Sequence, residues 1–357
     1  MTRVASGASI QLGLTTVLVL TWSQASGPAR VSDIVWQRAA LQTSSSFRGL
    51  SVARDGTIWV GGTEGTILYS ADTGSTWSVD TVAGAHSFDF RGVAAIDASV
   101  AYALVSSADT GRIYRTSDRG RTWQLLYRNE QHGVFLDGMG CWTDRRCLAA
   151  GDPIAGHFLV LTTDDGGAHW TEHDTLAAPP ARQGEAAFAA SNTSVIVGSG
   201  GRAWLATGGG PTGRVWRSSD YGMTWRVAET PIAAGNGSTG IFSVAFCDDQ
   251  RGVAVGGNYR TPDSTGAHVA LSADGGGVWT ASDSAHATPY LSGVACAASG
   301  PGQAAYVAVG PSGTFAALDG THWSRGARDG FNGLAALGRR LVAVGEKGAI
   351  ATARLPP

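Results

Sequence analysis

Short apolar runs alternate with polar turns along most of the chain, and they recur in groups. In the first group, residues 47–52, 57–62 and 66–70 are rich in β-branched, aromatic and small residues. Arg54-Asp55-Gly56 and Glu64-Gly65 separate them. Runs of this length, bounded by Gly and Asp, predict short β-strands joined by tight turns. A fourth strand is predicted to begin at Trp77.

A motif, Ser-x-Asp-x-Gly-x-Thr-Trp, follows the third strand of the group at residues 70–77. Related copies occupy residues 116–123, 163–170, 218–225 and 272–279, and a degraded copy occupies 319–323. The distance along the chain between consecutive tryptophans of the motif is 44 to 55 residues. This is the length of one four-stranded propeller blade with its loops.

The last repeat lacks a fourth strand. Residues 331–334, 340–345 and 349–352 supply three strands, whereas residues 34–38 form an isolated strand near the other end of the chain. We therefore predict an all-β, seven-bladed propeller of four-stranded antiparallel blades over residues 31–357, with the N-terminal strand closing the last blade. Closure of the ring would remove an exposed sheet edge. A six-bladed ring with extra edge strands is the alternative.

The repeated motif itself is interpreted as structural. Its Asp can accept hydrogen bonds from turn amides, its Gly permits the turn, and its Trp can be buried between sheets. A catalytic or calcium site would need one converging set, whereas these residues recur at the same turn of each blade. The members are Asp72, Trp77, Asp118, Trp123, Asp165, Trp170, Asp220, Trp225, Asp274 and Trp279.

The start of the chain has the pattern of an export signal. Arg3 precedes an apolar run at residues 10–20, and Ser23-Gln24-Ala25 fits a cleavage site. We expect a signal peptide at residues 1–25 and a periplasmic or extracellular protein without stable membrane insertion, since the run is short for a membrane span. An uncleaved anchor is the alternative. The formal net charge of -2 gives no reason to expect a nucleic acid as partner.

The four cysteines are compatible with an oxidising compartment. Cys141 and Cys147 flank a predicted hairpin turn and are a candidate disulfide, whereas the pairing of Cys247 and Cys296 is left open. Their spacing matches no zinc pattern, so we predict no metal site. We also predict no cofactor, because no phosphate-binding or dinucleotide-binding motif follows a predicted strand.

One position near the start of the first strand is polar in every repeat. The first strand of a propeller blade lines the central channel, so these residues are predicted to form a ring at the channel mouth. The ring would consist of Arg48, Arg91, Asp137, Glu185, Ser243, Ser292 and Asn332. A merely solvated rim is the alternative, because propeller channels are wet.

Long loops are predicted to gather on the face opposite the repeated motif. Because loops longer than geometry requires often carry function, we expect contact residues there. They are Asp152, His157, Arg182, Arg202, Trp204, Tyr259 and Arg260. Loop growth without function is the alternative.

The motif copies, the Phe-Arg-Gly sequences at Phe47 and Phe90, and the Val-Gly-Gly strand ends resemble BNR/Asp-box propellers. Within these the chain is most similar to the Ycf48/Hcf136-like proteins, exported photosystem II assembly factors and their bacterial relatives. The resemblance implies a seven-bladed propeller that binds a protein client through a basic patch, without catalysis. Arg48 and Arg91 are the arginines that match.

The sequence thus favours a non-catalytic binding or assembly propeller with a protein client. An anionic small molecule or a glycan is a second class of ligand left open. The enzyme alternative is a glycoside hydrolase related to sialidases, with Asp137 and Glu185 as the paired carboxylates. A sialidase would need an arginine triad and an Arg-Ile-Pro-like segment near the start, but the predicted ring offers two arginines and the sequence has no such segment.

Overall fold

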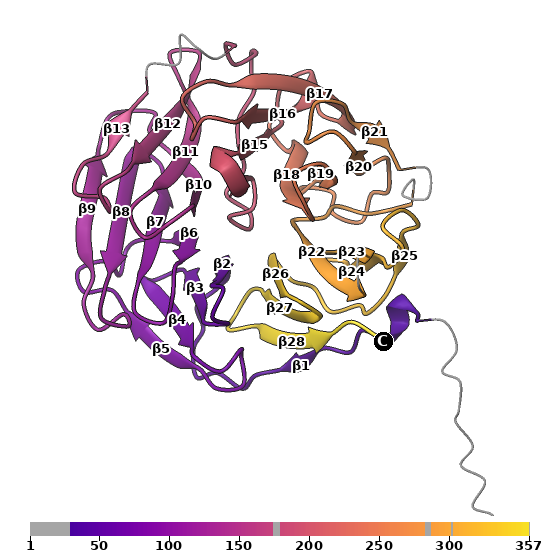
Figure 1. Ribbon diagram of the computed structural model, residues 1–357, viewed down its shortest axis with the longest axis horizontal. Coiled ribbons are helices and arrows are strands. Elements are labelled where there is room, and N and C mark those ends of the chain that lie inside the picture. Colours follow the sequence, from indigo (N-terminus) through magenta and orange to yellow (C-terminus); the bar gives the residue numbers. More distant parts are fainter. Residues whose placement is uncertain (1–28, 174–178, 283–286, 301–302, 357) are drawn as a thin grey trace, which may run out of the picture.

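The chain forms a ring of seven four-stranded antiparallel sheets, seen down its axis in Figure 1. The computed structural model describes residues 29–173, 179–282, 287–300 and 303–356. The predicted seven-bladed propeller is confirmed. The expected signal peptide at residues 1–25 lies outside the described residues.

Each blade is a meander of four strands, numbered from the channel outward. The first three blades contain β2 (Phe47–Val52), β3 (Ile58–Gly62), β4 (Thr66–Ser70) and β5 (Ser78–Thr81); β6 (Phe90–Ala95), β7 (Ala101–Ser107), β8 (Thr110–Thr116) and β9 (Gln124–Asn129); and β10 (Leu136–Cys141), β11 (Cys147–Ile154), β12 (His157–Thr163) and β13 (Thr171–Glu172). Blade four contains β14 (Val195–Val197), β15 (Ala203–Thr207), β16 (Thr212–Ser218) and β17 (Arg226–Ala233), and the short helix η3 (Ser199–Gly201) lies between β14 and β15. Blade five contains β18 (Thr239–Phe246), β19 (Gly252–Asn258), β20 (Val269–Ser272) and β21 (Thr280–Ala281). Blade six contains β22 (Gly293–Gly300), β23 (Gln303–Gly310), β24 (Gly313–Ala317) and β25 (Ser324–Arg325).

Blade seven is completed by the two ends of the propeller. β26 (Gly333–Leu337), β27 (Arg340–Val344) and β28 (Ile350–Arg354) are followed in the sheet by β1 (Gln37–Arg38). Gln37 pairs with Thr352 in antiparallel register, so the predicted closure by the N-terminal strand is confirmed. The strand is shorter than predicted, because Ile34 follows the short helix η1 (Val31–Asp33) and is buried in the core instead.

The antiparallel meander gives the ring two distinct faces. One face carries the turns between first and second strands together with the repeated Asp motifs, and we call it the Asp-box face. The other carries the turns between second and third strands and the connections between blades, and we call it the connection face. Every first strand therefore runs from the connection face toward the Asp-box face.

The Asp side chains bind the backbone of their own turns. Asp72 Oδ1 accepts hydrogen bonds from the amides of Ser75 (3.0 Å) and Thr76 (2.8 Å), and Asp118 Oδ1 accepts one from the Thr122 amide (2.9 Å). The hydrogen bond from the Thr76 hydroxyl to Oδ2, followed by the bond from the Thr76 amide, lowers the pKa of Asp72 to about 2. These carboxylates therefore form hydrogen bonds within their own turns.

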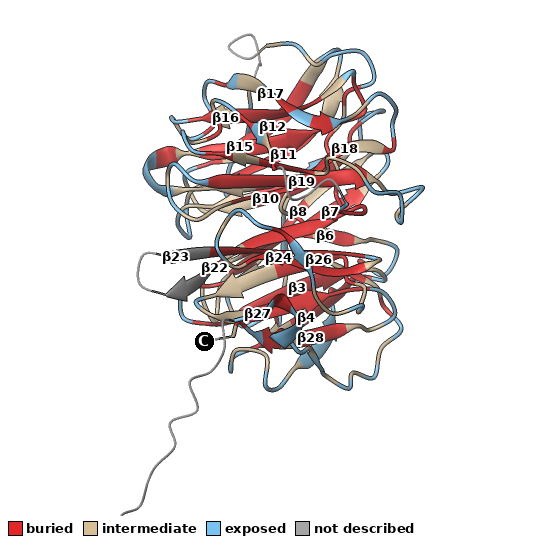
Figure 2. Ribbon diagram, turned by 90° about the vertical axis from the view of Figure 1, so that its right-hand side faces the viewer, coloured by how far each residue is buried: buried red, intermediate tan, exposed pale blue. Residues whose placement is uncertain are grey.

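The core lies between neighbouring blades. Trp59 and Ile67 of blade one are buried against Phe90 and Val93 of blade two, and Trp123 packs on Trp59 with ring centroids 5.9 Å apart. Figure 2 shows buried positions along the strands and exposed ones in the turns at both faces. Each blade is thus stabilised mainly by its neighbours, through apolar burial.

Two disulfides lie toward the Asp-box face. Cys141 and Cys147, the pair expected from the sequence, cross-link β10 to β11 within one hairpin. Cys247 and Cys296 connect blade five to blade six. In the part of the chain that the structure describes, no helix is long and apolar enough to cross a membrane.

Candidate binding site at the channel mouth

A β-bulge near the start of the inner strand sets the site geometry. The register shifts at Arg48 in β2, at Arg91 in β6 and at Asp137 in β10, so each of these residues is the extra one opposite the second strand. In β18 the extra residue is Phe242. The extra residue of a bulge points its side chain in a direction different from that of the regular pleat. These four side chains therefore do not follow the usual alternation between the two faces of the strand.

Arg48 is the most distinctive cation of the mouth. Its guanidinium has no ion pair and no hydrogen bond within the described ranges of the chain. Burial, and next the charge of Arg91, lower the pKa of Arg48, whereas Asp89 and Glu346 act in the opposite direction. Arg91 is itself paired with Asp89, with Nε 2.7 Å from Oδ2. A desolvated guanidinium without a counterion favours the binding of an anion.

Asp137 is the acidic counterpart of these arginines. Its side chain is fully buried, and neither carboxyl oxygen has a hydrogen-bond partner of good geometry among the described residues. Burial, followed by the nearby charge of Asp152, raises its pKa well above the usual range, and Arg91 opposes this only in part. Burial also raises the pKa of Asp152 to about 6. The two carboxyls therefore do not both ionise readily.

Glu185 does not belong to the mouth, contrary to the prediction from the sequence. Its carboxylate is buried and binds the guanidinium of Arg214 on β16, with Nε 2.8 Å from Oε1, and it also accepts a hydrogen bond from the Thr207 hydroxyl. Burial raises the pKa of Glu185, but the hydrogen bond from Arg214 and the bonds that follow bring it below its ordinary value. The expected pair of Asp137 with Glu185 is wrong, and the carboxyl beside Asp137 is Asp152.

Blade four departs from the repeat because residues 188–193 cross the channel. We call this segment the channel insert. Asn192 Nδ2 donates to the carbonyl of Val93 (2.9 Å) and its Oδ1 accepts from the amide of Met139 (3.1 Å), while the Val244 amide donates to the Thr193 carbonyl (2.9 Å). The insert thereby connects blade four to blades two, three and five and closes the channel, so the mouth above it is blind.

A length difference in the sequence could have revealed the insert. Arg48, Arg91 and Asp137 each lie 10 residues before the second strand of their blade, and so does Phe242. Glu185 lies 18 residues before β15. The excess in blade four is the segment that occupies the channel.

A cluster of aromatic rings packs beside the channel insert. Phe188 of the insert stacks on Phe242 with centroids 4.0 Å apart, and the rings of Tyr290 (4.8 Å) and Tyr259 (6.0 Å) meet Phe242 edge-on. Burial raises the pKa of Tyr290, and the nearby charge of Arg48 opposes this. Tyr259 was among the contact residues predicted from the sequence, whereas Phe188, Phe242 and Tyr290 were not.

Three neutral residues of the predicted ring connect blades instead of facing a ligand. Ser243 is buried and hydrogen-bonds Thr193 Oγ1 (2.6 Å) and the Val294 amide (2.9 Å). Ser292 Oγ donates to the Phe331 carbonyl (3.2 Å), and Asn332 Nδ2 donates to the Phe47 carbonyl (3.1 Å). Their polarity serves hydrogen bonding between neighbouring inner strands, so their assignment as ligand contacts is corrected.

Two of the predicted loop contacts lie elsewhere. Trp204 is buried in β15, stacks on Phe246 and donates from Nε1 to the Gly275 carbonyl of an Asp box (2.9 Å). Arg202 precedes it in the turn between β14 and β15, on the Asp-box face, where it pairs with Asp249. Trp204 therefore belongs to a strand and not to a loop.

The other predicted contacts lie on the connection face. His157 begins β12, and Arg260 follows Tyr259, which is 44% exposed, after β19. Arg182 pairs with Glu229 and also hydrogen-bonds Thr212. Asp152 accepts a hydrogen bond from the Ala187 amide (3.0 Å) at the base of the insert. In the described ranges, no three His, Cys, Asp or Glu side chains converge as metal ligands.

Comparison with known proteins extends the structural description. No family model and no curated protein sequence matches this chain. Among solved structures, Ycf48 bound to a D1 peptide is 14% identical, with a TM-score of 0.63 over 90% of this chain and 95% of that one. The fold is that of a β-propeller.

Two further solved structures extend the range of functions found on this fold. The Pan2 WD40 domain of Neurospora crassa is 12% identical, with a TM-score of 0.63 over 91% of this chain and 97% of that one. The GH74 xyloglucanase of Xanthomonas campestris is 17% identical, with a TM-score of 0.61 over 90% of this chain but 54% of the enzyme. At these identities the likeness establishes the fold alone.

Proposed function

We propose that this chain is an exported, non-catalytic binding propeller of the Ycf48/Hcf136-like type, which holds a protein client at the channel mouth of the connection face. The observation that carries the proposal is Arg48, a desolvated guanidinium without an ion pair in the described residues. Binding an anionic group of the client would supply its missing counterion.

The shape of the mouth supports a client that inserts one end. The channel insert makes the mouth blind, and Tyr259, which is 44% exposed and packs edge-on against the buried ring of Phe242, offers aromatic surface there. Aromatic residues and Arg dominate the energetics of protein interfaces. The solved complex of Ycf48 with a D1 peptide is an instance of peptide binding on this fold.

The test is recovery of interacting proteins from the native envelope by the mature chain and by the double variant Arg48→Gln/Arg91→Gln. We expect the double variant to lose at least one partner that the wild type retains, by about tenfold or more in recovered amount, since truncating a buried charge contact costs about 2–5 kcal/mol. Arg128→Gln is the matched control, because Arg128 is exposed on β9 and pairs with Glu130. Identical recovery by a folded double variant would contradict the proposal.

A glycoside hydrolase remains a second candidate because of Asp152. A carboxyl with a pKa of about 6 beside a second carboxyl suits a proton donor, and GH74 enzymes share the propeller fold. Turnover of chromogenic glycosides or of xyloglucan, abolished in Asp152→Asn, would favour this function over the binding propeller.

A further inference from the structure

A groove on the Asp-box face lies between blades three and four, away from the channel mouth. Its volume is about 590 Å³. Its walls come from the turn between β10 and β11, from the glycine-rich turn around η3 and from two Asp boxes, and Arg54 reaches it from the turn between β2 and β3 of blade one. The side chains that matter are Arg54, Trp142, Arg145, Arg146 and Tyr221.

The groove is cationic and is not neutralised from within. Three arginines line it against one acidic residue, Asp164. Arg54 and Arg145 have no side-chain ion pair or hydrogen bond in the described part of the chain. Arg146 approaches Asp164 only to 4.0 Å, and Asp164 is 77% exposed. Solvent screens such a pair, so the groove keeps a positive potential.

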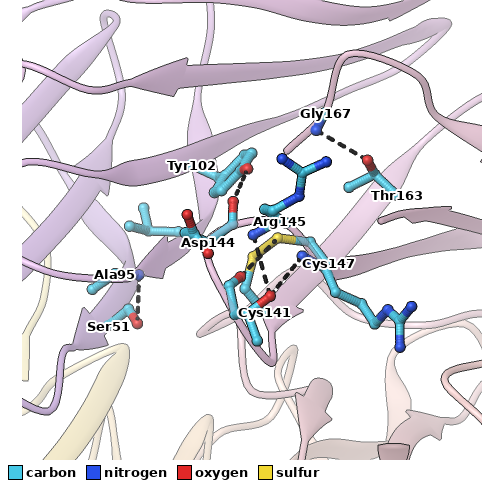
Figure 3. Close-up of a disulfide and its surroundings, with 12 residues drawn as sticks. Ser51, Ala95, Tyr102, Cys141, Asp144, Arg145, Cys147, Thr163 and Gly167 are labelled. Atoms are coloured by element: carbon cyan, nitrogen blue, oxygen red, sulfur yellow. Dashed lines mark hydrogen bonds between the residues drawn. A yellow bond between two sulfur atoms is a disulfide. The ribbon is translucent and has the colours of Figure 1, made fainter. Parts of the chain in front are cut away.

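The turn that carries Arg145 and Arg146 is held rigidly. The Cys141–Cys147 disulfide closes its base, and the backbone of Arg145 is fixed by the Gly166 amide (2.9 Å). The Tyr102 hydroxyl donates to the Asp144 carbonyl (2.7 Å). Figure 3 shows this closed hairpin tip, with Arg145 extending toward the Asp-box turn of Thr163 and Gly167. Binding here would order little additional backbone, which favours affinity.

Tyr221 supplies an aromatic surface at the fourth position of the Asp box of blade four. Its φ is 63°, and the equivalent residues Thr73 (58°) and Arg119 (68°) also have positive φ, whereas Gly166 and Gly275 are glycines. Tyr221 is thus the aromatic residue among these five positions. The ring is 37% exposed, with the Arg146 guanidinium 4.4 Å from its centroid and Trp142 edge-on at 5.1 Å.

The groove continues into the Asp-box end of the channel. That recess has a volume of about 560 Å³ and shares Arg54, Trp142 and Val197 with the groove. Apolar side chains such as Ile96 and Phe246 contribute to its wall, and Asn192 and Thr193 of the channel insert also line it. A ligand lying in the groove can therefore place an apolar group beside the arginines.

We propose that this groove binds an acidic, extended segment of a partner protein, with its carboxylates on Arg145 and Arg146 and a neighbouring apolar side chain in the channel recess. Charge complementarity favours an acidic ligand. The apolar recess favours a peptide over an acidic glycan, which has no aliphatic side chain to fill it. The site shares no residue with the mouth, so it does not rest on the function proposed there.

The test uses the fluorescein-labelled peptide Gly-Glu-Asp-Glu-Leu-Leu-Gly, titrated into the full mature chain and followed by fluorescence anisotropy. Two comparison peptides replace the acidic residues by Lys or the leucines by Ser, and a heparin-derived hexasaccharide is the glycan probe. We expect the acidic peptide with leucines to bind most tightly. Each peptide change should weaken binding by about tenfold, as should the variant Arg145→Gln/Arg146→Gln.

Arg128→Gln is the matched control, and it should bind as the wild type does. Both arginines of the test variant are on the surface, and melting temperatures will verify that it is folded. Equal binding of the Lys peptide, binding unaffected by the double substitution, or no peptide binding at millimolar concentration would overturn the proposal. Tighter binding of the hexasaccharide through the same arginines would overturn it in favour of a glycan site.

Discussion

Asp137 and Glu185 are two buried carboxyls in neighbouring blades, and their surroundings are opposite. Glu185 is held by Arg214 and Thr207, and its pKa lies below the ordinary value. Asp137 has no hydrogen-bond partner of good geometry among the described residues, and its pKa is raised by burial and by Asp152. Glu185 is an ionised part of the scaffold, whereas Asp137 is an unfavourably buried carboxyl at a candidate site.

The difference shows how one residue class serves two purposes in a repeat fold. A buried carboxylate with a bound guanidinium fixes the position of neighbouring strands. A buried carboxyl without partners destabilises the fold unless it is protonated, and such groups gather at functional sites. Three measurements test this contrast.

The largest effect is expected for Glu185→Ala. It leaves Arg214 buried without its counterion, which costs about 3–5 kcal/mol in the free energy of unfolding. Denaturation by guanidinium chloride measures this. Glu229→Ala is the control, because Glu229 pairs with Arg182 at the surface with 55% exposure, and exposed pairs contribute at most about 1 kcal/mol. Equal losses in the two variants would show that Glu185 is no scaffold residue.

A pH-dependent effect is expected from the acidic pair. The folded pKa of Asp152 is about 6, and the unfolded value is about 3.9, so between these values the native state binds a proton that the unfolded chain has released. Stability should therefore fall as the pH rises from about 4 to 6. The difference amounts to roughly 2–3 kcal/mol, and Asp137 adds to it in the same direction.

The variant Asp137→Asn/Asp152→Asn removes both titrations while it retains an acceptor for the Ala187 amide. Urea denaturation at several pH values should give a flatter profile than the wild type over this window. Asp164→Asn, at an exposed residue, should retain the wild-type profile. Parallel profiles of the double variant and the wild type would refute the raised pKa values.

The smallest effect is expected in an Asp box. Asp220→Ala removes the acceptor of the Thr224 amide (2.9 Å) and of the Ser218 hydroxyl (2.8 Å), which should lower the free energy of unfolding by about 1 kcal/mol. Asp220→Asn retains one acceptor oxygen and should lose less. An Asp220→Ala variant as stable as the wild type would show that the box carboxylate does not stabilise its turn.

Much of the fold could be predicted because its signals are local and repeated. The strand pattern, the Asp boxes and the unpaired strand at residues 34–38 led to seven blades and their closure. The arginine pair at the mouth was also predictable, since Arg48 and Arg91 occupy the same slot in regular blades. Glu185, Ser243 and Trp204 were misassigned, because an insertion and a one-residue register difference interrupt the alignment of repeats. A shift of one residue moves a side chain to the other face of a strand.

The architecture follows from the sequence pattern alone, since the strand and turn signals are local and recur in each repeat. Which polar groups lack partners, in contrast, depends on the folded ring. The carboxyl beside Asp137 comes from β11, the counterion of Glu185 from β16, and the segment that closes the channel from blade four. The burial and the hydrogen-bond partners of these side chains depend on residues that are distant along the chain. The charge state at each equivalent position of the repeats is therefore set by the assembled ring.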